Sequence, residues 1–189
     1  MVYTHPKRKT KVVFVQLGSP SEPTTKALRK YLRKFLGDPR VIDINPWLWK
    51  IILNFFVLPF RPKKSAKLYA RIWDGKSFPL ITNTRDFTNN VREELKKIDP
   101  DGHVEVNHAF LLSPPYVNEV YDSWEDDLKK GIGATKLLVI PMFPQYSEST
   151  IASGIDALAK ELSKRVKIPT FEVITNFHRT HAFIDNSVT

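Results

Sequence analysis

Four short apolar runs, separated by segments with helical spacing, constrain the fold of this chain more than any other feature. The runs lie at residues 11–17, 104–112, 136–140 and 171–177. Nearly unbroken apolar strands are typical of a parallel sheet that is covered on both faces. Apolar residues recur three and four apart in four other segments, at 24–36, 83–98, 117–128 and 151–166. The alternation predicts an α/β fold, with a four-stranded parallel sheet flanked by helices in a Rossmann-type lobe.

The length of 189 residues suits one domain that buries a core of ordinary size. We interpret residues 1–10 as a basic tail and residues 11–189 as the α/β lobe. The last nine residues read as the first turns of a helix that has no capping glycine. A natural domain rarely stops at such a point. We therefore expect that this last helix is cut and that a second lobe is absent from the sequence.

Charge and cysteine content limit the classes of function. The absence of cysteine excludes a disulfide scaffold, thiolate metal ligands and a cysteine nucleophile. Residues 1–76 hold 17 Lys and Arg against 4 Asp and Glu, whereas residues 77–189 hold 12 against 16. A basic half attracts nucleic acid, anionic lipid or an acidic small molecule, or it is simply a solvated face. No secretory signal pattern opens the chain, so we expect a cytoplasmic protein.

Residues 46–60 form an aromatic stretch with a single charge, Lys50. Its 15 residues are fewer than the ~20 that a membrane-spanning helix needs. Three interpretations remain open from the sequence. The stretch is a buried core helix, an interfacial segment on an anionic membrane beside the basic residues 61–64, or the lip of a pocket for a large flat apolar ligand.

Parallel sheets bind ligands at the carboxyl ends of their strands, which directs attention to the loops at 18–20, 113–115 and 144–150. The third loop is rich in hydroxyl groups, and an anion is favoured at the helix start that follows it. The alternative is that Ser149 or Thr150 only caps this helix. No phosphate-binding fingerprint is present. His178 and His181 are better interpreted as polar residues that lead into the last helix than as metal ligands. We therefore predict no metal site.

Four segments together resemble the N-terminal half of the ferrochelatase family, which inserts ferrous iron into a porphyrin in haem biosynthesis. The resemblance runs from residue 11 to the end of the chain. It is carried by Leu17-Gly-Ser-Pro20, by Tyr31-Leu-Arg-Lys-Phe-Leu-Gly-Asp-Pro-Arg-Val41, by residues 58–61 through 69–73, and by Pro141-Met-Phe-Pro-Gln-Tyr-Ser-Glu-Ser-Thr150.

The resemblance implies a chelatase-like protein of two lobes with the porphyrin in the cleft between them. Residues 46–60 would form the apolar lip of that cleft, which in some family members touches a membrane. Porphyrin and Fe2+ would be substrates, with no further cofactor, and Arg61 would meet the porphyrin's propionates. The porphyrin-binding residues implied are Leu17, Gly18, Ser19, Arg61, Tyr69, Phe78, Tyr146, Ser147, Ser149 and Thr150.

The chain departs from the family pattern in three places. Ser77-Phe78-Pro79 replaces a Gly-Ser-Pro, and Phe110-Leu111 replaces a polar pair. The family's catalytic histidine lies in a second-half motif that this sequence lacks, so we assign no catalytic residue and expect this chain alone to be inactive. It would supply the porphyrin-binding lobe of a lyase. The alternative is a non-catalytic half-chelatase that carries or senses a tetrapyrrole, as a monomer or a homodimer. We expect no nucleic-acid partner.

Overall fold

The computed structural model describes residues 9–131 and 134–187, and it contains a four-stranded sheet in which all neighbours are parallel. The predicted tail lies outside the described residues up to residue 8, and the first strand begins at its last residue, Thr10. The strand order is β2-β1-β3-β4. The strands are β1 Thr10–Gln16, β2 Val104–Phe110, β3 Lys136–Pro141 and β4 Thr170–Val173. The predicted α/β class is therefore confirmed.

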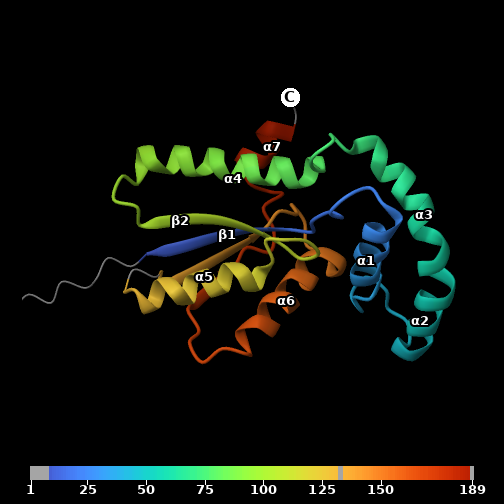
Figure 1. Ribbon diagram of the computed structural model, residues 1–189. Helices are drawn as coiled ribbons and strands as arrows, with labels where there is room; N and C mark the ends of the chain where they lie inside the picture. The colour runs from blue at the N-terminus through green and yellow to red at the C-terminus, as the bar shows by residue number, and fades with distance from the viewer. Residues whose placement is uncertain (1–8, 132–133, 188–189) are drawn as a thin grey trace, which may run out of the picture.

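Helices cover both faces of the sheet (Figure 1). Helix α4 (Pro79–Ile98) lies over one face, and α5 (Val117–Lys129) and α6 (Ser153–Leu162) lie over the other. Side chains of β1 alternate between two cores. Val12 and Phe14 join the α4 side, while Val13 and Val15 join the side of α5 and α6. This double burial explains why the apolar run of β1 is unbroken.

Helix α4 begins at Pro79, four residues before the predicted start, with its proline in the first turn, where a missing N–H costs nothing. Its predicted apolar face is only partly buried. Val91 and Leu95 pack on the sheet. Ile98, in the last turn, has the same apolar spacing but is 79% exposed.

Helix α1 (Thr25–Leu36) and a long helical arm lie together at the end of the sheet where β1 finishes (Figure 1). Thr24 caps α1 by accepting a hydrogen bond from the backbone of Ala27 at 3.2 Å. The arm comprises α2 Pro46–Ile52, a π-helical turn Leu53–Val57, α3 Leu58–Tyr69 and a 3-10 turn Ala70–Ile72. A separate small core joins the arm to α1, formed by Tyr31, Leu32, Leu36, Leu53 and Leu58.

The arm continues as a helix past residue 60 in spite of its prolines. The π-helical turn precedes Pro59, and Pro62 lies inside α3. A proline at position 62 cannot donate to the carbonyl of Leu58, four residues earlier. The Arg29 side chain of α1 donates to that carbonyl instead, at 3.2 Å. A neighbouring helix thus satisfies the group that the proline leaves free, and the arm continues.

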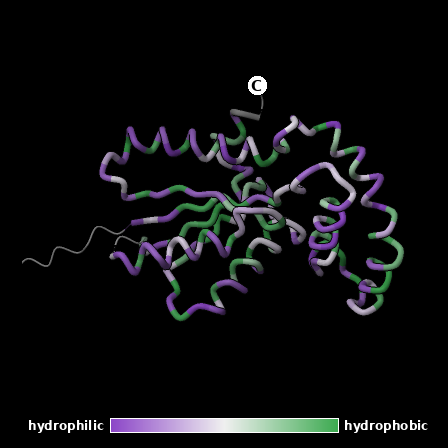
Figure 2. Tube along the Cα trace, viewed as in Figure 1, coloured by the Kyte–Doolittle hydropathy of each residue, from purple (hydrophilic) through white to green (hydrophobic). Residues whose placement is uncertain are grey.

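The interpretation of residues 46–60 as a buried core helix is wrong. Six of its large apolar side chains are about half to more than three-quarters exposed: Trp47, Leu48, Ile51, Phe55, Phe56 and Phe60. Figure 2 shows these apolar turns of the arm at the periphery, away from the sheet. Only Leu53 and Leu58 are buried, against α1. None of the described helices has the length and apolar character that crossing a bilayer requires.

The chain continues from β4 to a short helix, α7 (His181–Ser187), where the sequence predicts one. Phe183 of α7 packs edge-on against Phe177, with ring centroids 5.7 Å apart. The backbone of Phe177 and of His178 donates to Pro144 O, which ties this segment to the loop that follows β3. Helix α7 therefore lies near the carboxyl ends of the strands.

Candidate functional site

The loops that follow β1, β2 and β3 meet at the carboxyl ends of the strands, as a parallel sheet requires. The backbone of Leu112 donates to the carbonyl of Leu17 at 3.0 Å, and that of Met142 donates to the carbonyl of Val15 at 2.8 Å. Ser19 N–H donates to the hydroxyl of Ser113 at 3.3 Å. Two of the three predicted loops are thus joined by direct hydrogen bonds.

Gly18 and Ser19 shape the loop that follows β1 at this junction. Gly18 has a φ of 92°, which is strained for any residue with a side chain, and an added Cβ would lie 2.3 Å from the Ser113 hydroxyl. The Tyr31 hydroxyl donates to the carbonyl of Gly18 at 3.3 Å. Ser19 is itself buried. These two predicted site residues therefore shape the loop and expose little surface to a ligand.

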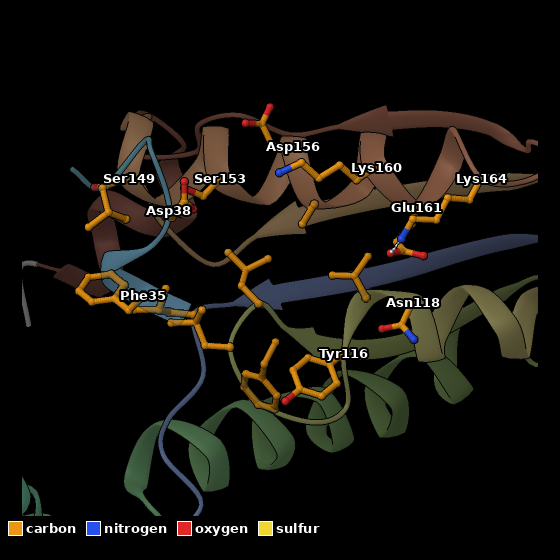
Figure 3. Close-up of a pocket in the computed structure, with 17 residues that line it drawn as sticks. Phe35, Asp38, Tyr116, Asn118, Ser149, Ser153, Asp156, Lys160, Glu161 and Lys164 are labelled. Carbon is orange, nitrogen blue, oxygen red and sulfur yellow. Dashed lines mark hydrogen bonds and ion pairs between the residues drawn. The ribbon is translucent and has the colours of Figure 1, made fainter. Parts of the chain in front are cut away.

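A cavity of about 280 Å³ opens beside the junction (Figure 3). Its floor is apolar and comes from the strand ends and from α1, with Leu17, Phe35, Phe110, Leu111 and Leu112 among its members. Its rim is polar and comes mostly from α6 and the preceding turn, with Ser149, Ser153, Asp156, Lys160 and Lys164. An apolar floor with a few convergent polar groups is the usual design of a small-molecule site.

Two side-chain bridges hold α1 and the loop after it over this cavity. Lys34 donates to the hydroxyl of Tyr116 at 2.9 Å and lies over that ring. Arg40 binds Asp156 of α6 in a bidentate pair, with nitrogen–oxygen distances of 2.5 and 3.1 Å. The hydrogen bond from Arg40 lowers the pKa of the Asp156 carboxyl. Because both bridges are exposed, each contributes little to stability on its own.

The hydroxyl-rich loop after β3 is only partly directed at the cavity. A π-helical turn, Glu148–Ala152, begins the segment that continues as α6. The hydroxyls of Ser147 and Thr150 lie 2.5 Å apart and satisfy each other, so neither Ser149 nor Thr150 caps the helix through its side chain. Ser149 lines the cavity, whereas Tyr146 is exposed.

Arg61, Tyr69 and Phe78 do not line the cavity. Tyr69 packs edge-on against Tyr31 and against Phe78, at centroid distances of 6.2 and 5.5 Å. Phe78 is 1% exposed, so it offers no accessible surface to a ligand in this structure. Burial raises the pKa of the Tyr31 hydroxyl. Arg61 is exposed on α3 and does not line the cavity.

Several cavity residues escaped the sequence analysis. Phe35, Asp38, Tyr116, Asp156 and Lys160 line the cavity, yet each has the ordinary spacing of a helix face or a loop. One signal was available: Ser149, Ser153, Asp156 and Lys160 recur three and four apart, which places them on one face of α6. Within residues 9–131 and 134–187, no group of three or more His, Asp or Glu side chains is placed to hold a metal ion.

Comparison with known proteins shows which family this chain is similar to. The family model described as Ferrochelatase matches residues 9–189. The ferrochelatase of Idiomarina loihiensis is 41% identical over 92% of this chain and 46% of its own length, and that of Marinobacter nauticus is 37% identical over 92% and 45%. A coproporphyrin III ferrochelatase of Streptococcus mutans is 37% identical over 94% of this chain and 54% of its own length. The chain spans about half the length of these relatives, within which it corresponds to the N-terminal half. With a family match over nearly its whole length, this chain belongs to the ferrochelatase family.

Proposed function

We propose that this chain is the porphyrin-binding lobe of a ferrochelatase, which inserts ferrous iron into a porphyrin in haem biosynthesis. The observation that carries the proposal is the cavity at the strand ends, whose apolar floor and polar rim suit a flat apolar ring with carboxylate side chains. A volume of about 280 Å³ is less than a whole porphyrin occupies, so part of the ring lies outside the cavity when it is bound.

In this proposal the chain binds and orients the porphyrin and does not perform the proton transfers. Phe35 and Leu112 contact the ring from two sides of the cavity floor, and the rim residues of α6 face its polar substituents. Removal of the pyrrole protons needs a base within hydrogen-bond distance of the ring nitrogens. Among the described residues that line the cavity there is no histidine, and the carboxylates lie at its rim. We assign that step to residues outside this chain.

Filling the cavity tests this proposal. Ala157 lines the cavity, whereas Ala159, two residues further along α6, points to solvent. Titration of each variant with a porphyrin, followed by quenching of the porphyrin's fluorescence, should show weak binding for Ala157→Phe and unchanged binding for Ala159→Phe. Equal affinity in both variants would remove the cavity as the site.

The second candidate function is a carrier or regulator that binds a tetrapyrrole. This function is favoured if the native protein binds porphyrin as a monomer or dimer and no form of it inserts a metal into the ring.

We also propose that the arm rests on an anionic membrane surface. Its apolar side chains are exposed on successive turns, with Trp47 at 78% and Phe55 at 71%. Residues 44–73 hold six basic residues and no acidic one. An exposed apolar strip beside unopposed positive charge matches the interface of a bilayer that contains anionic lipid.

Sedimentation with lipid vesicles tests the contact. The protein should sediment with phosphatidylglycerol-containing vesicles and less with pure phosphatidylcholine, and Phe55→Ser combined with Phe56→Ser should abolish the effect. Ile98→Ser combined with Val166→Ser is the control, because it removes two apolar side chains outside the arm that are even more exposed than Phe55 and Phe56. Loss of sedimentation in the control would mean that the attraction is general and does not belong to the arm.

A further inference from the structure

The cavity lies between two separately packed parts of the lobe. On one side, Phe35 of α1 and Val41 of the turn after it pack against the cluster that joins α1 to the arm. On the other side, Ser153 and Asp156 lie on α6, which packs on the sheet through Leu158. Figure 3 shows the side chains of Phe35 and Asp156 on opposite sides of the cavity. Because the two walls belong to different cores, the cavity widens when these parts move apart.

A short turn after α1 carries one side chain from the first wall to the second. The Asp38 carboxylate accepts a hydrogen bond from the backbone of Arg40 at 2.9 Å, and the Asp38 carbonyl accepts one from Val41 at 3.0 Å. The turn directs the Arg40 guanidinium to both oxygens of Asp156. Lys160 also attracts the Asp156 carboxylate, but the hydrogen bond from Arg40 is the larger cause of its lowered pKa. Arg40 itself does not line the cavity.

We propose that Arg40 is a positioning residue whose ion pair with Asp156 straps the two walls together and has to open before a porphyrin leaves. The inference rests on the proposed function and adds a release step to it. The edge of the ring that is seated in the cavity lies between these walls, so separating them frees it. An exposed ion pair suits this role, because it is weak enough to open and is screened by salt.

Two arginine variants separate release from folding. Arg40→Gln removes the cation of the strap, and its thermal unfolding midpoint should stay that of the wild type, because the pair is exposed. Arg85→Gln is the matched control. It removes another exposed arginine that is paired with an aspartate, Asp86 at 3.3 Å, and that does not line the cavity.

Release is measured by mixing the porphyrin-loaded protein with excess serum albumin and following the porphyrin's fluorescence as it transfers. In the wild type, raising KCl from about 20 mM to about 500 mM should speed release about two- to fivefold, which is the effect of screening one exposed ion pair. Arg40→Gln should release at the fast rate already in low salt and should lose the response to salt. Arg85→Gln should behave as the wild type does.

Charge reversal tests whether the two side chains act on each other. Asp156→Arg brings two guanidinium groups together, so this variant should release porphyrin fastest. Arg40→Asp combined with Asp156→Arg should restore slow release that responds to salt. If the new guanidinium bound the porphyrin directly, the single variant Asp156→Arg would release it more slowly than the wild type, and the strap would be refuted.

Two further results decide the inference. A salt response that persists in Arg40→Gln would belong to the ligand's own charges, and it would also overturn the strap. If the wild-type protein takes up no porphyrin, the proposed function fails and this inference fails with it. If the wild type binds porphyrin and all variants release it at the same rate, the cavity site stands and only the role of Arg40 is lost.

Discussion

At the residue scale, Gly18 carries the closest steric constraint near the cavity. Replacement by alanine places a Cβ at φ 92° and 2.3 Å from the Ser113 hydroxyl. Gly75 offers a matched control, because its φ is 95° but no atom lies within 4 Å of an added Cβ. Gly75→Ala should cost about 1 kcal/mol of unfolding free energy from the backbone alone. Gly18→Ala should cost about 1–3 kcal/mol more, from overpacking.

Urea unfolding of the two glycine variants measures this difference directly. Gly18→Ala should also weaken porphyrin binding, because Leu17 beside it lines the cavity floor and would be displaced. Equal midpoints for the two variants would show that the loop relaxes and that the close approach to Ser113 does not constrain the junction.

The surroundings of single residues are the least predictable part of this structure. Gly18 was predicted as a ligand contact, and the structure gives its lack of a side chain a steric reason. Phe78 was also predicted as a contact, yet it lies buried against Tyr69 and Trp73. Lys11 is fully buried in the central strand, beside Glu105 at 3.2 Å. No local pattern distinguishes such a lysine from a solvated one, because its partners come from distant segments.

At the element scale, spacing predicted the strands and most helices, since each buries one face against a neighbour. The arm was the exception. Prolines usually interrupt a helix, but the carbonyl left free at Leu58 is satisfied by Arg29 of α1. The bridges over the cavity were equally hidden from sequence analysis. Arg40 and Asp156 are 116 residues apart, and only the tertiary fold places the loop after α1 beside α6.

The junction of α4 with β2 gives a pH prediction at the same scale. The Asp99 carboxylate at the end of α4 accepts from the backbone of Val104 at 2.7 Å and lies 2.8 Å from the His103 ring nitrogen. The hydrogen bond with His103 is the main cause that lowers the pKa of Asp99. A lowered pKa in the folded state adds stability at pH values above the unfolded pKa, and that stability is lost as the pH falls through the folded pKa.

Asp99→Asn should therefore be less stable than the wild type at pH 7 and approach it in acid. The difference in unfolding midpoint should persist from pH 7 to about 5 and close as the pH falls below about 4, the ordinary range of an aspartate. Thermal unfolding of both proteins across this pH range measures the difference. A difference that is the same at pH 3 and pH 7 would show that the charge of Asp99 does not fasten this junction.

At the scale of the whole molecule, the buried apolar residues form three clusters within the part of the chain that the structure describes. Two of them lie on the two faces of the sheet, and the third joins α1 to the arm. The third cluster is connected to the cavity through Tyr31, which holds Gly18, and through the exposed pairs made by Lys34 and Arg40. Because exposed pairs are weak, α1 and the arm should open as a unit while the sheet remains folded.

Two leucines of equal burial test this division. Leu58 belongs to the cluster of α1 and the arm and is 2% exposed, while Leu158 belongs to the cluster under α5 and α6 and is 4% exposed. Each leucine-to-alanine change should lower the unfolding free energy of the part of the molecule that contains it by about 2–5 kcal/mol. By hydrogen exchange, Leu58→Ala should speed exchange in residues 25–69 and leave the amides of β1 and β3 protected. Leu158→Ala should speed exchange in the sheet and also in α1 and the arm, because α1 and the arm need the folded sheet to pack against. Uniform loss of protection in both variants would mean that the lobe unfolds as one unit, and the cavity wall formed by α1 would then be as rigid as the sheet beside it.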